Sequence, residues 1–294
     1  MKVAFLGLGA MGFPMAGHLQ TAGYDLTVYN RTYKKAEEWQ AKYQGKVEST
    51  PALAANGADV VLMCVGNDDD VRSVVFGEHG VLSTMASGSI LVDHTTTSAE
   101  LARELDESLH AKSIGFIDAP VSGGQAGAEN GKLTVMLGGT EEHYAQISSI
   151  LDCYAQKHQL MGSVGCGQLT KMVNQICIAG IVQGLSEALH FAENAKLDTD
   201  KVVDVISKGA AQSWQLENRS STMLKNQFDF GFAVDWMRKD LGIVLDEANR
   251  NKSRLPLTAL VDQFYAQVQA NGGGRFDTSS LITLLNTNKL SVDK

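Results

Sequence analysis

Residues 2–12 read KVAFLGLGAMG, an apolar run that leads into regularly spaced glycines. Val3–Leu6 has the composition of a buried strand, and the apolar spacing of Met11–Thr21 predicts a helix. In a strand–loop–helix unit, Gly7 permits the tight turn, Gly9 lets the backbone approach a pyrophosphate, and Gly12 lets the helix pack on the strand. The motif therefore predicts a dinucleotide-binding loop rather than a merely structural turn; its residues are Gly7, Leu8, Gly9, Ala10, Met11 and Gly12.

The end of the next predicted strand, Leu26–Tyr29, indicates which dinucleotide is bound. It is followed by Asn30-Arg31-Thr32, about twenty residues after the glycines, where NAD-selective sites place a carboxylate for the ribose 2′-hydroxyl. Arg31 can instead pair with a 2′-phosphate, and Asn30 and Thr32 can add neutral donors. The sequence favours NADP, with NADPH preferred over NADH; the alternative is a solvated loop arginine.

Short apolar runs alternate with amphipathic stretches through the first half of the chain. The predicted strands are Val3–Leu6, Leu26–Tyr29, Val60–Cys64, Ile90–Val92, Phe116–Ile117 and Thr134–Leu137. The predicted helices are Met11–Thr21, Tyr33–Tyr43, Pro51–Asn56, Ala99–His110 and Glu141–Leu151. This alternation predicts a parallel sheet covered by helices on both faces.

The pattern changes near Gly165, where strand signals disappear. One long helix is predicted from Gln168 to about Lys196, and Gly180 and Gly184, one turn apart within it, permit close approach of another helix. Further helices are predicted at Thr199–Lys208, Gln215–Asn226, Asp235–Asn251, Pro256–Ala270 and Ser279–Leu285. We therefore expect an α/β Rossmann-type domain, residues 1–164, and an all-helical domain, residues 165–294, joined by the long helix.

Composition excludes several classes of protein. A chain of 294 residues that is 44% hydrophobic is typical of a globular protein of about two domains. A formal charge of −8 without a basic cluster argues against a nucleic-acid partner. The four cysteines show no metal or disulfide spacing, so no metal is expected and a cytoplasmic location is favoured. The glycines at the start argue against a signal peptide, and no other apolar run approaches the ~20 residues of a membrane span.

Small residues follow the strand at Phe116–Ile117. In Asp118-Ala119-Pro120-Val121-Ser122-Gly123-Gly124, the last three residues expose backbone N–H groups and a hydroxyl. Such a loop can hold a substrate carboxylate without a cationic side chain. Read alone, the loop is better interpreted as a glycine-rich structural turn.

Lys171 and Asn174 lie three residues apart in the first turns of the long helix, so they share one face. The positive end of the helix dipole lowers the pKa expected for a lysine there. Such a lysine can exchange a proton with a substrate hydroxyl while Asn174 orients that hydroxyl. The alternative is a solvated lysine near a helix start.

Several motifs, in this order and spacing, resemble the β-hydroxyacid dehydrogenase family over nearly the whole chain. They are Gly7–Leu19, Asn30–Thr32, Asp118–Gly131, Gly165–Asn174 and Lys239-Asp240-Leu241. The family includes 3-hydroxyisobutyrate dehydrogenases, tartronate semialdehyde reductases and glyoxylate/succinic semialdehyde reductases. The resemblance implies reversible hydride transfer between NADP(H) and a small hydroxy acid or semialdehyde.

The resemblance also assigns roles to residues. It implies that Lys171 is the general acid/base, Asn174 helps hold the reacting oxygen, and Ser122, Gly123 and Gly124 bind the substrate carboxylate. It further implies that Thr96 contacts the nicotinamide end of the cofactor, Lys239 reaches the cofactor, and Phe232 and Asp240 line the substrate pocket. A homo-oligomer, dimer or tetramer, is expected.

Some features leave the interpretation open. Imine reduction, or a non-catalytic NADP-binding sensor, are the alternative functions; relatives with either role usually lack the lysine that stands here as Lys171. His94, a large Trp214 and Cys166 have no assigned role, and the identity of the substrate does not follow from motif spacing.

Overall fold

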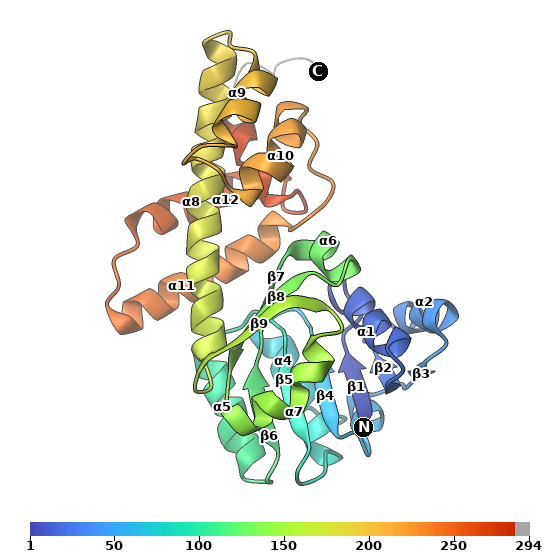
Figure 1. Cartoon of the computed structure of the whole chain (residues 1–294). Helices are drawn as coiled ribbons and strands as arrows, with labels where there is room; N and C mark the ends of the chain where they lie inside the picture. Colours follow the sequence, from blue (N-terminus) through green and yellow to red (C-terminus); the bar gives the residue numbers. More distant parts are fainter. Residues whose placement is uncertain (286–294) are drawn as a thin grey trace. The chain divides into compact units, whose positions relative to one another are not determined.

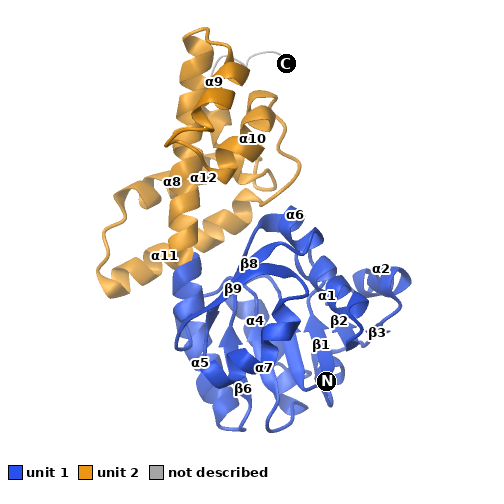
Figure 2. Cartoon of the chain, in the orientation of Figure 1, with its two compact units in different colours: residues 1–171 blue, residues 172–294 orange. Residues whose placement is uncertain are grey.

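The computed structural model describes residues 1–285, and the chain divides into two compact units, Met1–Lys171 and Met172–Lys294 (Figure 2). The predicted helical domain extends to residue 294, so its last residues lie outside the described part. The long helix α8 (Cys166–Asn194) begins in the first unit and continues into the second. The domain boundary between residues 164 and 165 stays a prediction.

The first unit is built around one nine-stranded sheet (Figure 1). The strands are β1 (Lys2–Leu6), β2 (Asp25–Tyr29), β3 (Lys46–Val47), β4 (Val60–Met63), β5 (Ile90–Asp93), β6 (Gly115–Asp118), β7 (Val121–Ser122), β8 (Leu133–Gly138) and β9 (Ala155–Gly162). Their order is β3-β2-β1-β4-β5-β6-β8-β7, with β9 paired to β8.

The expectation of a purely parallel sheet is wrong for its last part. Along the sheet from β3 through β2, β1, β4 and β5 to β6, neighbouring strands pair in parallel, whereas β8 runs antiparallel to both β6 and β7. The chain reverses between β7 and β8 through the short helix α6 (Gly124–Glu129) instead of crossing over by a long helix, and this short return permits an antiparallel partner. β9 then pairs parallel to β8.

Strand residues alternate between two hydrophobic cores, which explains why the strands read as continuous apolar runs. Val3 and Phe5 pack in one core, which includes Trp39, and Ala4 and Leu6 pack in the other, which includes Leu105. Both faces of the sheet are therefore buried, as a mostly parallel sheet requires. The helices of this unit are α1 (Gly12–Thr21), α2 (Tyr33–Tyr43), α3 (Pro51–Ala55), α4 (Asp68–Phe76), α5 (Ala99–His110), α6 (Gly124–Glu129) and α7 (Glu141–Leu151), with a 3₁₀ turn η1 (Val81–Ser83).

Some short or polar elements are absent from the sequence-based expectation: β3, β7, β9, α4 and α6. β9 alternates half-buried and exposed residues and contains Gln, Lys and His, so no apolar run marks it. α4 opens on Asp68, Asp69 and Asp70, which resemble a solvated loop, although Asn67 caps it by accepting a hydrogen bond from the Asp70 N–H.

The second unit is helical. Besides most of α8 it contains α9 (Thr199–Ile206), α10 (Trp214–Leu224), α11 (Val234–Asn251) and α12 (Pro256–Ala270). Its last described element, η2 (Thr278–Leu284), is a 3₁₀ helix where an α-helix was expected. α8 contributes Ala179 and Val182 to the core of this unit, with Tyr265 of α12.

Helix α8 is long and apolar enough, by length and composition alone, to cross a membrane, which the sequence analysis did not anticipate. A buried core helix meets the same criterion, and a little under half of the most apolar window of α8 is buried. A Cβ at Gly180 would touch Leu257 of α12 at 3.4 Å, whereas one at Gly184 would meet no heavy atom within 4 Å among the described residues. The Leu257 side chain of α12 therefore makes an ordinary packing contact at Gly180, and a close approach of helix backbones along the glycine pair stays a prediction.

Candidate cofactor and active site

The loop between β1 and α1 has the shape that its glycines predict. Gly7 has a φ of +96°, and a Cβ there would overlap the carbonyl oxygen of Cys64. A Cβ at Gly12 would overlap the Gly7 carbonyl oxygen and lie 2.9 Å from the Phe5 ring, so α1 packs directly on its strand. A Cβ at Gly9 meets no heavy atom within 4 Å among the described residues. The open side of the loop is therefore at Gly9, where a pyrophosphate can approach backbone N–H groups.

Asn30 fixes this loop to the end of β2. Its side-chain carbonyl accepts a 2.8 Å hydrogen bond from the Leu8 N–H, and its NH₂ group donates to the Thr32 carbonyl at 2.9 Å. The Asn30 amide is thus engaged within the protein, and Thr32, the exposed N-cap of α2, makes no side-chain capping bond. Arg31, with its side chain 82% exposed, pairs through Nη1 with Asp70 Oδ1 at 2.5 Å. Arg31 is therefore a solvent-exposed cation at this strand end.

The carboxyl ends of β4 and β5 continue the same edge of the sheet. The Val65 N–H donates to Thr95 Oγ1 at 3.0 Å, which ties the loop after β4 to the loop after β5. Thr96 follows directly and is half-buried. The glycine loop follows β1, Arg31 follows β2 and Thr96 follows β5, and these strands lie in the order β2-β1-β4-β5 in the sheet. All three therefore lie at the carboxyl edge, where open α/β sheets bind dinucleotides.

His94 is a buried structural residue in this structure. Its Nδ1 lies 2.7 Å from the Ala119 carbonyl and its Nε2 lies 2.9 Å from the Tyr154 hydroxyl. Burial lowers the pKa of His94 to about 4, so the ring is neutral at pH 7. Nδ1–H therefore donates to the carbonyl and Nε2 accepts from the tyrosine hydroxyl. The bonds of His94 to Ala119 and Tyr154 therefore hold the backbone at the start of the Ala119–Ser122 segment in place.

Asp118 anchors the start of α8. Its carboxylate accepts hydrogen bonds from the Gly165 N–H at 2.7 Å and the Gln168 N–H at 2.8 Å. A Cβ at Gly167 would lie 2.8 Å from the same carboxylate, so the helix start comes very close to the end of β6. Gln168 adds two bonds: its NH₂ group donates to the Thr95 carbonyl, and its oxygen accepts from the Thr97 N–H. The first turn of α8 is thereby fixed to the ends of β5 and β6.

Asp118 faces Asp93 across the paired strands β5 and β6. Burial raises the pKa of Asp118 to about 6, against the opposing effect of its backbone hydrogen bonds. Burial likewise raises the pKa of Asp93 to about 7, although Thr95 donates to it. The sheet edge therefore holds two carboxyl groups that take up protons near neutral pH.

Lys171 lies buried in α8, one turn beyond the anchored residues. Ser122 ends the short strand β7, opposite Thr134 of β8, and Gly123 and Gly124 lead directly into α6. Lys171 and the Ser122–Gly124 loop both belong to the first unit, as does the glycine loop. Apart from Lys239, the residues proposed for the cofactor, for the substrate carboxylate and for proton transfer thus share one compact unit. Lys239, Asn174, Phe232 and Asp240 belong to the second.

In the second unit, three of the remaining residues belong to a polar chain along α8 and α11, and Phe232 lies outside it. The Asn174 NH₂ group donates to the Gln175 oxygen at 2.8 Å, and the Gln175 NH₂ group donates to the buried Asp240 at 2.6 Å. Lys239 Nζ lies 3.0 Å from the other oxygen of Asp240. Phe232 is half-buried, and its N–H donates to the carboxylate of Asp277 at 2.9 Å. Asn174, Asp240 and Lys239 are thus linked through Gln175.

Trp214 is not a core residue, because half of its surface is exposed. Arg219 lies over its ring at 4.7 Å and over the ring of Phe230 at 4.9 Å, and the same guanidinium pairs with the buried Asp277. Cys166, like the other cysteines, is a free thiol. No group of three or more His, Cys, Asp or Glu suited to a metal ion occurs among residues 1–285.

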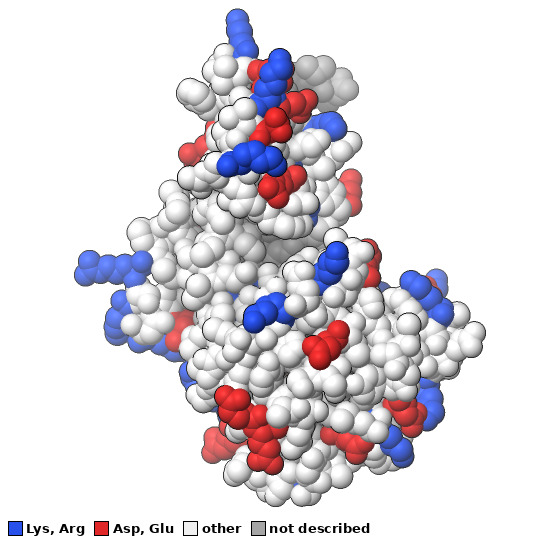
Figure 3. Space-filling model, viewed as in Figure 1, with Lys and Arg blue, Asp and Glu red and all other residues white. Residues whose placement is uncertain are grey.

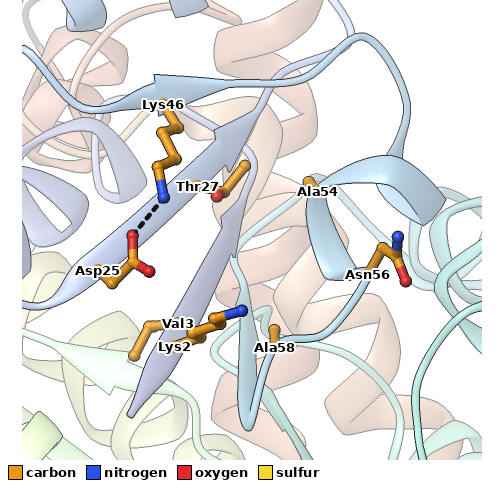
Figure 4. Close-up of a pocket in the computed structure, with 8 residues that line it drawn as sticks. All are labelled: Lys2, Val3, Asp25, Thr27, Lys46, Ala54, Asn56 and Ala58. Carbon is orange, nitrogen blue, oxygen red and sulfur yellow. Dashed lines mark hydrogen bonds and ion pairs between the residues drawn. The ribbon is translucent and has the colours of Figure 1, made fainter.

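Surface features elsewhere do not compete with this site. A small pocket is lined by residues of β1, β2 and β3 near the amino ends of these strands, and by α3 and the loop that follows it; Asp25 and Lys46 on its lining pair at 2.6 Å (Figure 4). This is the sheet edge opposite the glycine loop. On the surface drawn in Figure 3, acidic and basic side chains are interspersed rather than gathered into a basic patch.

Asp118, Gln168, Asp93 and Asp70 were not identified as site residues from the sequence. Asp118 was visible only as the first residue of a motif, and its partners lie 47 and 50 positions away. For Asp70, the available signal was the capping pattern that starts a helix after β4.

Comparison with known proteins identifies the class. The family model described as the NAD binding domain of 6-phosphogluconate dehydrogenase matches residues 2–165. The model described as NAD-binding of NADP-dependent 3-hydroxyisobutyrate dehydrogenase matches residues 165–285. Together with the glycine loop, these matches define a nicotinamide-nucleotide-dependent oxidoreductase.

Relatives place the chain more narrowly. It is 33% identical to 2-hydroxy-3-oxopropionate reductase of Escherichia coli, over 97% of each chain. It is 30% identical to mitochondrial 3-hydroxyisobutyrate dehydrogenase of Mus musculus, over 96% of this chain and 86% of the other. The solved structure of Mycobacterium tuberculosis 3-hydroxyisobutyrate dehydrogenase with L-serine has a TM-score of 0.88 at 28% identity, covering 97% of this chain and 99% of that one. The chain belongs to the β-hydroxyacid dehydrogenase family.

Reductive aminases and imine reductases also share the fold. The reductive aminase of Aspergillus terreus has a TM-score of 0.62 at 17% identity, a likeness that shows the fold alone.

Proposed function

We propose that the protein is an NADP(H)-dependent reductase, or the matching dehydrogenase, of a small carboxylated aldehyde, with Lys171 as the general acid/base. The observation that carries the proposal is the shared location of the glycine loop, Arg31 and the anchored start of α8. All three belong to one unit and lie at the carboxyl edge of its sheet. The family membership supplies the reaction class, hydride transfer between a nicotinamide and a hydroxy acid.

The residues of the loop fit a dinucleotide. The open space at Gly9 adjoins the start of α1. The Phe13 and Met15 N–H groups donate to the Gly9 and Met11 carbonyls, so the backbone N–H groups earlier in the loop are the ones offered to a pyrophosphate at the positive end of the helix. Arg31 offers an exposed guanidinium for a 2′-phosphate, which supports NADP over NAD. Asn30 acts indirectly, because its amide holds the Leu8 N–H and the Thr32 carbonyl in place. When bound, the nicotinamide supplies or accepts the hydride.

Lys171 supplies the proton. As an ammonium it stabilises negative charge that develops on the carbonyl oxygen during reduction, and it then transfers a proton to that oxygen. Its burial in α8 limits competition from water, and the Asp118 and Gln168 anchors fix the turn that precedes it. Asn174, one turn further on, orients the same oxygen. Ser122, Gly123 and Gly124 bind the carboxylate through N–H groups and the serine hydroxyl, and Thr96 contacts the nicotinamide end.

The test is the initial rate of NADPH oxidation with a panel of aldehydes. The panel contains succinic, methylmalonic and tartronic semialdehydes, glyoxylate, and an uncharged aldehyde of similar size. We expect one carboxylated member to react strongly, the uncharged one weakly, and NADPH to outperform NADH. If no aldehyde of the panel is reduced although NADPH binds tightly, the substrate class is refuted and imine reduction or nucleotide sensing is favoured.

Lys171→Ala tests the proton-transfer role. We expect kcat to fall by about 10²–10⁴-fold, the usual contribution of a general acid, while the Kd for NADPH changes by no more than a few-fold. The matched control is Lys157→Ala, an exposed lysine on β9 that should leave kcat unchanged. Activity of Lys171→Ala near the wild-type level would remove Lys171 from the mechanism.

We further propose a homo-oligomer in the cytoplasm. Val173, Ile181 and Phe191 of α8 are exposed apolar residues, and Gly184 leaves the helix backbone open between them. Such a surface suits a second copy of the chain. Light scattering would measure the subunit number, and a monomer would contradict this part of the proposal.

The free thiols support the cytoplasmic part of the proposal, because a reducing compartment keeps cysteines unpaired.

A further inference from the structure

The ion pair between Arg31 and Asp70 joins two segments on either side of the glycine loop. Arg31 follows β2 and Asp70 lies in the first turn of α4, which follows β4. Strand β1, which leads into the glycine loop, lies between β2 and β4 in the sheet. The pair therefore spans the side of the site where the adenosine half of a dinucleotide must enter.

Asp70 is well placed to compete for the guanidinium. Its side chain is only 24% exposed, and its own N–H is held by Asn67 at 2.9 Å, so the residue is fixed by the start of α4. Arg31 is the more exposed partner, with 82% of its side chain exposed. The other two carboxylates of this turn have different partners: Asp68 accepts from the Ser98 hydroxyl at 2.6 Å, and Asp69 lies 3.8 Å from Arg72.

We propose that Asp70 is a specificity-determining residue that weakens the preference for NADP(H) over NAD(H) by competing with the 2′-phosphate for Arg31. This inference rests on the proposed function, because it requires Arg31 to bind that phosphate. A phosphate carries nearly two negative charges, so it must displace the carboxylate from Arg31 or bind beside it against repulsion. An NAD-type ribose carries no such group, and Asp70 does not oppose it.

The neutral variant Asp70→Asn tests the inference while keeping the side-chain size and the Asn67–residue 70 backbone bond. Titration measures Kd for NADP⁺, 2′,5′-ADP and NAD⁺. We expect NADP⁺ and 2′,5′-ADP to bind about two- to fivefold more tightly, since loss of a carboxylate that pairs with an exposed guanidinium has an effect of that size. The gain should shrink at high salt. Binding of NAD⁺ should stay within twofold of the wild type.

The control is Asp69→Asn, which removes the same charge from a side chain that is 95% exposed and paired with Arg72. It should change these constants by less than twofold. In an Arg31→Ala background, Asp70→Asn should lose most of its effect, because no guanidinium remains to be released.

The results separate the two proposals. If Arg31→Ala abolishes the NADP preference but Asp70→Asn leaves NADP⁺ binding unchanged or weaker, the inference about Asp70 is overturned and the cofactor proposal stands. Weaker binding of NAD⁺ to Asp70→Asn would also overturn it, since Asp70 would then hold the ribose. If the wild type does not distinguish NADP⁺ from NAD⁺ and Arg31→Ala changes nothing, the cofactor proposal fails and the inference fails with it.

Discussion

The glycines of the β1–α1 loop make opposite predictions for a single added methyl group. Gly9→Ala places a Cβ where no described heavy atom lies within 4 Å, and Gly9 does not have a positive φ. Gly12→Ala places the methyl group against the Gly7 carbonyl and 2.9 Å from the Phe5 ring. The first change should therefore affect ligand binding, and the second should affect folding.

The magnitudes follow from these surroundings. Gly9→Ala should leave the free energy of unfolding unchanged or raise it by about 0.4–1 kcal/mol, because alanine restricts the unfolded chain. The methyl group occupies the approach to the backbone N–H groups, and the loss of one hydrogen bond to a charged phosphate costs about 1.5–3 kcal/mol. The Kd for NADPH should then rise by about 10–150-fold. Gly12→Ala overpacks a backbone contact and should cost about 3 kcal/mol, which lowers Tm by about 6–12 °C in a unit of this size.

The assays are thermal unfolding of each ligand-free variant and titration with NADPH. A Gly9→Ala variant that binds NADPH with the wild-type Kd would refute the idea that the pyrophosphate approaches Gly9. A Gly9→Ala variant as unstable as Gly12→Ala would show that the space at Gly9 is not open. Wild-type stability of Gly12→Ala would refute direct packing of α1 on its strand.

Two further predictions concern buried carboxylates. Burial raises the pKa of Asp118 to about 6 and of Asp93 to about 7 from 3.8, so the folded state retains their protons where the unfolded state has lost them. Their contribution to the free energy of unfolding is therefore lost as pH rises from about 4 to 7, by about 3 kcal/mol for Asp118. In urea unfolding, Asp118→Asn should lack this pH-dependent loss of stability. A variant whose free energy of unfolding depends on pH as the wild type does would contradict the prediction. Asp277→Ala leaves Arg219 and the Phe232 N–H without their carboxylate. It should lower the free energy of unfolding of the second unit by about 3–5 kcal/mol in chemical unfolding. A loss of less than about 1 kcal/mol would show that Asp277 does not hold these groups together.

Much of the first unit could be predicted because its signals are local. Each buried strand had to be apolar on both sides, so the runs Val60–Cys64 and Ile90–Val92 were predicted as strands, and the observed strands differ from them by one residue each. β9 could not be recognised in this way, because the polar residues between Ala155 and Leu160 leave no apolar run. Its pairing with β8 is made by backbone groups that every sequence possesses.

The candidate site was predictable to different extents. The position of Lys171 on the first turns of a long helix followed from periodicity, but the reason that this helix starts where it does was not visible. That reason is Asp118, whose carboxylate lies at the end of another strand and binds the N–H groups of Gly165 and Gln168. Arg31 was identified as a cation at the end of β2, whereas its partner Asp70 lies 39 residues later.

The sequence by itself determined the glycine loop, because the lack of a side chain at Gly7 and Gly12 is a property of single positions that the backbone needs. It also determined the alternation of strands and helices and the long helix, since periodicity acts over neighbouring residues. The tertiary structure decided which distant charges meet: Asp118 with the start of α8, Asp93 with Asp118, and Arg31 with Asp70. Electrostatic pairing depends on distance in space, and the order of strands in the sheet, rather than spacing along the chain, sets that distance.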